Sequence, residues 1–502
     1  MRPLPFPHQL VDTATLLEKP AYALFVEPGG GKTRTVVDAA CEMYRQREID
    51  AMIVVCPAAA RSVWADPNPV LGEWAKWAPK DVVFQLREYH QKTKLDVNIA
   101  HGFNILVTNP EFIRRTERLQ PLQVWAKRRK TLLVVDESWA YKTPNATQTK
   151  AMYRLRACCQ RVVILNGTPG SPAEQYSQFR ILDPAILGSF NHASFRAHYC
   201  VMGGYMNKQV VGYQRMDEFH ARTAPYCVVR KIRDCVDLGP EPVRTQIEAK
   251  LTPTTWKAYT ELRDELVTWL SEHESVTAMQ AGVKVMRLAQ ITNGFVGGVS
   301  CATEQTGDLF DEGTEDLLAD GMRTSAPPSP LREIGREKLE ALLAYLRQSW
   351  SDDKLLVFAR FRPDVERTRN ALAAVFNKHE VVRVYGSQLP IERDRAKALL
   401  APGGDPTPAI VVANAQSGGA GLNFAAAQLC VFLANDYSFR LRRQAEGRVD
   451  RPGQVGRCTF LDVLAVGPNG QRTIDHQIVA ALRQKEEIET WSTREWLKAL
   501  QA

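Results

Sequence analysis

The feature that most constrains the fold of this chain is a glycine-rich segment between a short apolar run and an apolar helix pattern. Residues 23–26 are apolar, residues 27–33 read Glu-Pro-Gly-Gly-Gly-Lys-Thr, and residues 36–40 are mostly apolar. Glycines allow backbone N–H groups to wrap around an anion, and the N-terminus of the following helix directs its positive end to the same point. A strand, such a loop and a helix in this order predict an α/β fold with a phosphate-binding loop.

The rest of the chain repeats the alternation of short β-branched runs and helix-like stretches. The runs are apolar throughout, as expected of strands that are covered on both faces of a parallel sheet. We therefore predict an α/β protein with two lobes, each built on a parallel sheet. The predicted strands are 23–26, 52–56, 105–108, 132–135 and 162–166 in the first lobe, and 354–359, 381–385, 409–413, 429–434 and 459–463 in the second.

The length of 502 residues allows about two to four domains. We assign residues 1–235 to the first lobe, with a helical protrusion at about 173–235. Residues 236–502 form the second lobe, with a helical insertion at about 253–300. Residues 301–330 contain seven acidic side chains and end in Ala-Pro-Pro-Ser-Pro, a composition that predicts a flexible acidic loop.

Composition excludes several classes of protein. With 45% hydrophobic and 24% charged residues, the chain is neither fibrous nor wholly disordered. No apolar run approaches the roughly 18 residues that span a bilayer, and Met1 opens no signal peptide, so we expect a cytoplasmic protein. Ten cysteines without zinc-type spacing indicate free thiols rather than a metal site or a disulfide framework. The net charge of +8 permits a polyanionic partner.

The glycine-rich segment predicts an ATP site. The side chain of Lys32 can reach the β and γ phosphates, and the hydroxyl of Thr33 can hold Mg²⁺. The strict form of this motif has glycine at position 26, where this chain has valine. We expect the nucleotide to contact Gly29, Gly30, Gly31, Lys32, Thr33 and Arg34.

A second part of the ATP site is predicted where a buried strand ends in two carboxylates. Asp136 and Glu137 follow residues 132–135. Magnesium binds carboxylate oxygen, so we expect Asp136 to hold it, mostly through water, and Glu137 to orient and deprotonate the attacking water. Near the N-terminus, two roles are open for the side-chain amide of Gln9. It can contact adenine, or it can cap a helix.

With these residues in place, the chain resembles a superfamily 2 nucleic-acid motor, and more closely the Swi/Snf branch of double-stranded DNA translocases in a minimal, bacterial or viral form. The most specific match runs from Gln444 to Gln454 and contains Arg448 and Arg451. The resemblance implies two RecA-like lobes, with both arginines and Gly421 at the nucleotide. Planar guanidinium groups suit the charge of a transferring phosphoryl group.

The resemblance also implies nucleic-acid contacts and coupling residues. Trp139 stands where the family usually has histidine, and residues 229–231 resemble a shortened basic motif. Basic clusters at 114–118, 127–130 and 440–443 are further candidates for phosphate contacts, or are solvated helix faces. The implied DNA contacts are Thr108, Asn109, Ser417 and Gly418, and the implied coupling residues are Gly167, Thr168 and Gln444.

The expected function is an ATP-driven motor on double-stranded or branched DNA, without sequence specificity, that remodels DNA or displaces bound proteins. Such a protein would associate with the nucleoid of a bacterium or with DNA in a virus-infected cell. Two alternatives stay open: a strand-separating DNA or RNA helicase, and an ATP-switched factor that binds DNA or RNA polymerase. The expected cofactors are ATP and Mg²⁺.

Overall fold

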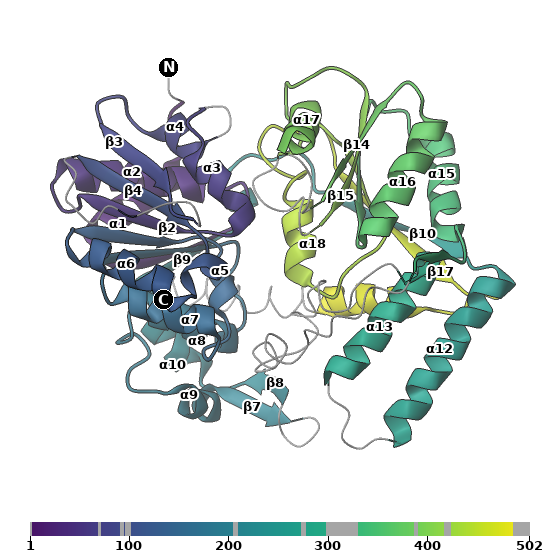
Figure 1. Cartoon of the computed structure of the whole chain (residues 1–502), viewed down its shortest axis with the longest axis horizontal. Helices are drawn as coiled ribbons and strands as arrows, with labels where there is room; N and C mark the ends of the chain where they lie inside the picture. The colour runs from purple at the N-terminus through teal and green to yellow at the C-terminus, as the bar shows by residue number, and fades with distance from the viewer. Residues whose placement is uncertain are drawn as a thin grey trace. The chain divides into compact units, whose positions relative to one another are not determined.

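A computed structural model describes residues 3–68, 72–90, 95, 102–203, 209–272, 278–297, 330–385, 390–415 and 423–484. The chain divides into two compact units, one formed by residues up to 237 and the other beginning at residue 238 (Figure 1). Each unit has its own central sheet. The predicted acidic loop at 301–330 falls outside the described residues except for Pro330.

The first unit is built on a seven-stranded sheet in the order β3-β4-β2-β5-β6-β1-β9, and all its strand pairs are parallel. The five strands predicted for this lobe are confirmed. The strands are β1 (Ala21–Val26), β2 (Ala51–Val55), β3 (Phe84–Glu88), β4 (Phe103–Thr108), β5 (Thr131–Val135), β6 (Arg161–Asn166) and β9 (Cys227–Arg230).

The central strands of this sheet are covered on both faces. Along β1, Phe25 belongs to one apolar cluster and Leu24 to another, because successive side chains point to opposite faces. The cluster that contains Leu24 includes side chains of α1 (Pro7–Glu18), α2 (Lys32–Arg45), α3 (Arg61–Ala65) and α4 (Glu73–Trp77). The other cluster includes side chains of α5 (Pro110–Ile113), α6 (Thr116–Lys127), α7 (Thr147–Arg156) and α8 (Pro172–Leu182).

The predicted helical protrusion at about 173–235 contains strands as well as helices. The segment holds α8, α9 (His192–Tyr199), α10 (Met216–Thr223) and α11 (Ile232–Cys235), but also the antiparallel pair β7 (Cys200–Gly203) and β8 (Gln209–Tyr213). It then returns to the main sheet as β9, which pairs with β1. β7 ends in Gly203 and β8 contains Gly212, and glycine is depleted in strands, so neither segment is predicted as a strand.

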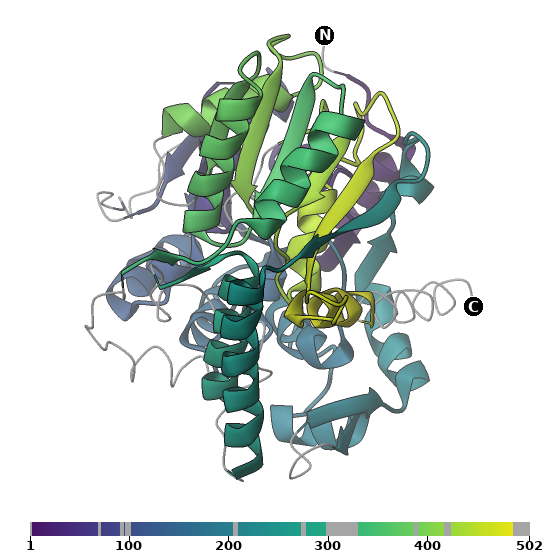
Figure 2. The ribbon, with the colours of Figure 1, turned by 90° about the vertical axis from the view of Figure 1, so that its right-hand side faces the viewer.

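The second unit is built on a six-stranded parallel sheet in the order β10-β17-β16-β13-β15-β14 (Figure 2). Its five predicted strands are confirmed, whereas β10 lies between the two predicted helical segments and was not predicted as a strand. Six of the eight β10 residues are exposed, and among the described strands this edge strand pairs with β17 alone. The strands are β10 (Val243–Lys250), β13 (Lys354–Ala359), β14 (Glu380–Val384), β15 (Ala409–Asn414), β16 (Leu429–Phe432) and β17 (Thr459–Val466).

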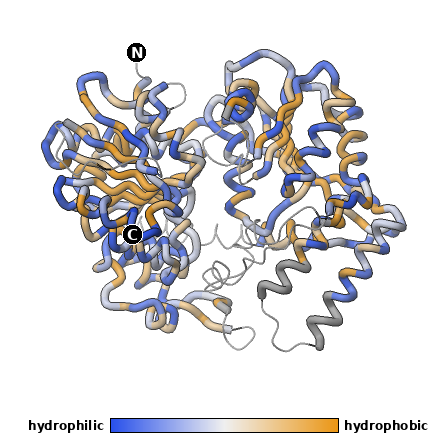
Figure 3. Tube along the Cα trace, viewed as in Figure 1, coloured by the Kyte–Doolittle hydropathy of each residue, from blue (hydrophilic) through white to orange (hydrophobic). Residues whose placement is uncertain are grey.

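Helices flank the second sheet, and the predicted helical insertion is a hairpin of two helices. α12 (Pro253–Glu272) and α13 (Ala278–Thr292) run side by side away from the sheet (Figures 1 and 2). The other helices are α15 (Glu337–Ser349), α16 (Arg362–Val375), α17 (Pro390–Leu400) and α18 (Phe439–Glu446). The hydrophobic colouring of Figure 3 follows the strands of both sheets.

Buried polar contacts attach this hairpin to the rest of the second unit. The carboxylate of Asp475 accepts hydrogen bonds from Lys338 Nζ at 3.0 Å and from Thr292 Oγ1 at 3.1 Å.

Among the described helices, we find no stretch that combines the length and the apolar character needed to cross a membrane. The nine described cysteines are free thiols. The described residues contain no group of three or more histidine, cysteine, aspartate or glutamate side chains that could hold a metal ion.

Candidate functional site

The glycine-rich loop lies between the end of β1 at Val26 and the start of α2 at Lys32. Gly29 and Gly31 have φ angles of 92° and 77°, in the left-handed region that favours glycine. A Cβ atom at Gly30 would lie 2.4 Å from Val26 Cγ1, and one at Gly31 would lie 2.0 Å from Gln9 Nε2. The loop therefore requires glycine both for its conformation and for space at the N-terminus of α2.

Lys32 connects this loop to the acidic pair. Its Nζ donates a hydrogen bond to the carbonyl oxygen of Val26 and another, at 3.5 Å, to that of Glu27. The charge of Lys32 also acts to lower the pKa of Asp136. The fold thus brings together the loop after β1 and the carboxylates after β5, two segments about a hundred residues apart in sequence.

The carboxylate of Asp136 is held by two donors. Its Oδ2 accepts from Trp64 Nε1 at 2.9 Å, and its Oδ1 accepts from the backbone N–H of Glu137 at 3.0 Å. Burial and then the charge of Glu137 raise the pKa of Asp136 to about 6, against the lowering effects of Trp64 and Lys32. A desolvated carboxylate with a second one on the next residue is suited to a divalent cation, and Thr33 supplies a hydroxyl on α2. The residues present therefore fit Mg²⁺.

The residues after Asp136 turn sharply and contact α8. Glu137 has φ 53° and ψ 53°, a left-handed conformation that costs free energy for a residue with a side chain. Ser138 Oγ donates to Gln178 Oε1 at 2.6 Å, and Trp139 Nε1 donates to Glu174 Oε1 at 3.3 Å. Trp139, in the position usually taken by histidine, therefore makes a polar contact of its own with α8.

Two of the predicted coupling residues, Gly167 and Thr168, lie between the glycine-rich loop and α8. The backbone N–H of Gly167 donates to Asn166 Oδ1 at 2.9 Å, and a Cβ atom at Gly167 would lie 3.5 Å from Pro28 Cδ. Thr168 follows directly, and Ser171 caps α8. This location is compatible with the coupling role, which stays a prediction.

The contacts of Gln9 and Arg34 bear on two predictions. The sequence left two interpretations of Gln9 open, and it did not predict the contacts that Arg34 makes. Gln9 Oε1 accepts from the N–H of Phe6 at 2.9 Å, as a helix cap does, while its Nε2 donates to the carbonyl of Gly31 at 3.2 Å. Arg34 is buried, its guanidinium donates to the carbonyls of Pro3 and Leu4, and it lies over the ring of Trp77. These contacts hold the N-terminal segment, so the side-chain position of Arg34 lends no support to the predicted nucleotide contact.

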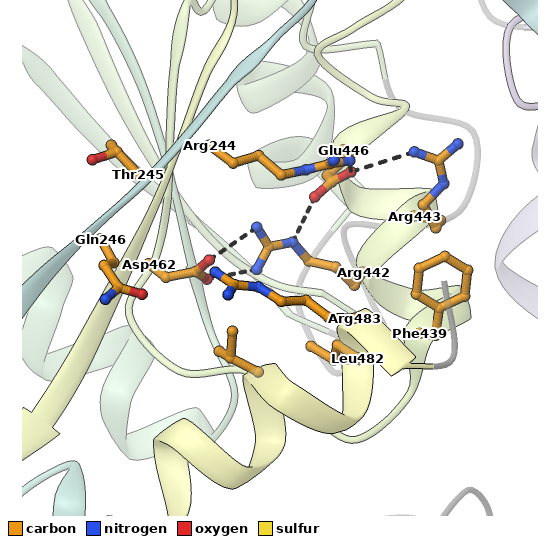
Figure 4. Close-up of a pocket in the computed structure, with 11 residues that line it drawn as sticks. Arg244, Thr245, Gln246, Phe439, Arg442, Arg443, Glu446, Asp462, Leu482 and Arg483 are labelled. Carbon is orange, nitrogen blue, oxygen red and sulfur yellow. Dashed lines mark hydrogen bonds and ion pairs between the residues drawn. The ribbon is translucent and has the colours of Figure 1, made fainter. Parts of the chain in front are cut away.

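In the second unit, α18 leads to Arg448 and Arg451 and is anchored by Arg442. Figure 4 shows Arg442 bonded to Asp462 on β17 and to Glu446 on its own helix. The Nη1–Oδ1 distance to Asp462 is 2.6 Å, and the Nε–Oε1 distance to Glu446 is 2.8 Å. Burial acts to raise the pKa of Glu446, but the charges of Arg442 and Arg244 outweigh it and the pKa is lowered.

These side chains line a cavity of about 370 Å³ between β10, α18 and the helical residues 474–484 (Figure 4). The predicted residues Gln444, Arg448 and Arg451 follow Arg442 in the sequence. The backbone N–H of Phe424 donates a hydrogen bond to the carbonyl of Arg448 at 3.0 Å. The predicted contacts Ser417, Gly418 and Gly421 lie outside the described residues.

A second cavity, of about 540 Å³, lies in the first unit near the end of β4. Thr108 is fully buried, so its hydroxyl does not face solvent as the predicted DNA contact requires. Asn109 lines the cavity and donates to Glu111 Oε2 at 2.5 Å. The lining residues are Arg61, Glu88, His90, Asn109, Glu111, Phe112, Arg114 and Arg115. Sequence reasoning missed Arg61 and His90, although both follow the end of a strand.

Comparisons with known families find two matches. Residues 18–295 match the SNF2-related domain, and residues 337–453 match the helicase conserved C-terminal domain. Together the two matches include both the glycine-rich loop with its acidic pair and the arginines that follow α18.

Curated relatives are longer proteins. The chain is 23% identical over 475 residues to the DNA annealing helicase and endonuclease ZRANB3 of Bos taurus, covering 92% of this chain and 38% of the relative. It is 22% identical over 453 residues to the DNA excision repair protein ERCC-6 of Homo sapiens, covering 87% and 28%. An uncharacterized ATP-dependent helicase of Mycoplasma genitalium is 20% identical over 475 residues, covering 92% and 39%. The chain thus spans less than half the length of these relatives.

Among solved structures, the Sulfolobus solfataricus SWI2/SNF2 ATPase core in complex with dsDNA is 18% identical. The match covers 99% of this chain and 95% of the Sulfolobus solfataricus chain, with a TM-score of 0.41. The Sulfolobus solfataricus SWI2/SNF2 ATPase core domain is 19% identical and covers 93% and 86%, with a TM-score of 0.37.

Proposed function

This chain belongs to the SNF2-related domain family, and from that premise we propose that it is an ATP-driven motor that moves along double-stranded DNA. The resemblance to the Swi/Snf branch of superfamily 2 is confirmed, as are the two parallel-sheet units and the class of helicase-like ATP hydrolase. Movement on intact duplex, the DNA contacts and the role of each site residue are our proposals.

The observation that carries the ATPase part of the proposal is the glycine-rich loop between β1 and α2, with left-handed Gly29 and Gly31, in the same parallel sheet as strand β5, which ends before Asp136 and Glu137. In our proposal, the loop amides and Lys32 hold the phosphates, while Thr33 and Asp136 hold Mg²⁺. Bound Mg²⁺ would supply positive charge that neutralises the phosphate oxygens. Glu137, one residue farther along the chain, orients the attacking water and accepts its proton.

Arg448 and Arg451 would complete the site from the second unit. Guanidinium groups that contact the γ-phosphoryl group only when the two units close would make hydrolysis depend on closure. ATP then favours the closed state, and hydrolysis removes this preference, which is the differential affinity that a conformational cycle needs.

The cavity near β4 supports a contact with nucleic-acid backbone. The side chain of Arg61 is 26% exposed, and Arg114 and Arg115, which line the same cavity, are also exposed. Guanidinium groups that bind phosphate oxygens fix the position of a duplex without reading its sequence. The names of the curated relatives, a DNA annealing helicase and a DNA excision repair protein, support DNA as the substrate.

An ATPase assay with blunt duplex DNA, branched DNA, single-stranded DNA and RNA tests this function. We expect duplex and branched DNA to stimulate hydrolysis most. Stimulation should fall with added salt, with a log-log slope of about −0.9 per phosphate contact. The protein should also displace the third strand of a triplex in an ATP-dependent reaction while a blunt duplex stays paired.

Two outcomes would favour the alternatives. Efficient unwinding of a tailed duplex without triplex displacement would assign the chain to the strand-separating helicases. Slow hydrolysis that no nucleic acid stimulates, together with nucleotide-dependent binding to a polymerase, would indicate a switched binding factor.

A further inference from the structure

Trp64 contacts the metal-binding carboxylate of the proposed ATP site. This residue lies on α3, its side chain is 2% exposed, and its indole N–H donates to Asp136 Oδ2 at 2.9 Å. The other carboxylate oxygen accepts from the N–H of Glu137. Both oxygens of Asp136 are therefore oriented by the protein, one of them by a residue from a distant part of the chain. Groups that orient a metal ligand in this way set its affinity for the metal.

The same short helix reaches the cavity near β4. Arg61 is the first residue of α3, one turn before Trp64, and its Nη1 lies 3.5 Å from Glu88 Oε2. Arg114 and Arg115 line the same cavity, and their side chains have no hydrogen-bond or ion-pair partner within the described part of the chain. Three arginines face two carboxylates there, Glu88 and Glu111, so the lining carries a net positive charge.

We propose that Trp64 is a positioning residue that couples phosphate binding in the Arg61 cavity to the Asp136 carboxylate. The coupling rests on the proposed function, since the phosphate belongs to the backbone of duplex DNA. A phosphate held by Arg61 restrains α3, and the restrained helix keeps the Trp64 indole on Asp136 for a larger fraction of time. Metal and nucleotide then bind to a preorganised carboxylate, and by linkage they tighten DNA binding by the same factor.

The test measures the affinity for Mn²⁺ with a non-hydrolysable ATP analogue by calorimetry, with and without blunt duplex DNA. Trp64→Phe keeps an aromatic ring and removes the indole donor, so we expect metal and nucleotide affinity to fall about 10-fold. In the wild type DNA should increase that affinity, and in Trp64→Phe the increase should disappear.

Trp74→Phe is the matched control. Trp74 is fully buried in the same apolar cluster as Trp64, but its Nε1 has no hydrogen-bond partner among the described residues. The substitution therefore removes the same ring atoms without removing a hydrogen bond. Its metal affinity and its response to DNA should match the wild type.

Further comparisons keep the proposal falsifiable. Equal losses in Trp64→Phe and Trp74→Phe would show that packing, and not the hydrogen bond, is responsible. An unchanged DNA effect in Trp64→Phe would refute the coupling. If Trp64→Phe does not fold, Arg61→Gln replaces it and should lose the effect of DNA on metal affinity. If DNA has no effect on the wild type while Trp64→Phe still loses metal affinity, the duplex-DNA function fails and the positioning of Asp136 stands.

Discussion

At the scale of single residues, Lys32 and Glu137 have different tasks in the proposed site. Lys32 holds phosphate, so Lys32→Ala should weaken both ATP binding and hydrolysis. Glu137 acts on water, so Glu137→Gln should retain ATP affinity and lower kcat by a factor of about 10² to 10⁴. Nucleotide binding by fluorescence anisotropy and steady-state ATPase assays separate the two variants. An equal loss of ATP affinity in both would contradict these roles.

The second prediction for a single residue concerns Asp136 and the pH dependence of the free energy of unfolding. Its pKa of about 6 in the nucleotide-free protein lies above the ordinary aspartate value. At pH values between the ordinary aspartate pKa and about 6, the folded state binds more protons than the unfolded state. The Asp136 carboxyl therefore lowers the free energy of unfolding progressively as the pH rises through this range, and its full effect is reached above pH 6. Asp136→Asn should therefore raise the free energy of unfolding at pH 8 by about 1–3 kcal/mol, and by much less at pH 4.5. Chemical denaturation at both pH values checks this. The same difference at pH 8 and pH 4.5 would exclude the carboxylate as the cause.

At the scale of elements, the anchor of α18 determines where Arg448 and Arg451 lie. Arg442 is 9% exposed and neutralises two buried carboxylates, Glu446 and Asp462. Arg442→Met should cost about 3–5 kcal/mol of unfolding free energy, because it leaves the buried Asp462 carboxylate without its ion pair and Glu446 without one of its cationic partners. It should also lower kcat by displacing the arginines that follow.

Arg443→Met serves as the control for this variant. The Arg443 guanidinium is 36% exposed and lies 3.7 Å from Glu446, so its loss should cost less than about 1 kcal/mol. Urea denaturation and ATPase rates compare the two proteins. Similar stabilities would show that the anchor does not depend on Arg442.

The elements also show which parts of the fold a sequence pattern can predict. The ten predicted strands lie mostly in the apolar interior of a sheet, where both faces require apolar side chains. The edge strands β3, β9 and β10 were missed, because an edge strand that is short or largely exposed needs no continuous apolar run.

At the scale of the whole molecule, each unit contributes part of the proposed site. Arg451→Ala should lower kcat by a factor on the order of 10³, as expected for loss of an arginine finger. DNA affinity should change little, because the phosphate contacts that we propose lie on other residues. Single-turnover hydrolysis and DNA binding at fixed salt measure the two quantities. Turnover at the wild-type rate would remove Arg451 from the site.

The sequence by itself determined the parallel α/β architecture, ten of the strands along the chain and the candidates Lys32, Asp136 and Glu137. These features depend on local patterns, such as apolar runs, a glycine-rich turn and carboxylates at the end of a strand. The tertiary structure decided which distant groups meet. It buried Thr108, committed Arg34 to the N-terminal segment, anchored α18 through Arg442 and placed the Trp64 indole on Asp136. Such contacts depend on side-chain direction and depth in the packed molecule, and the order of residues along the chain does not encode either one locally.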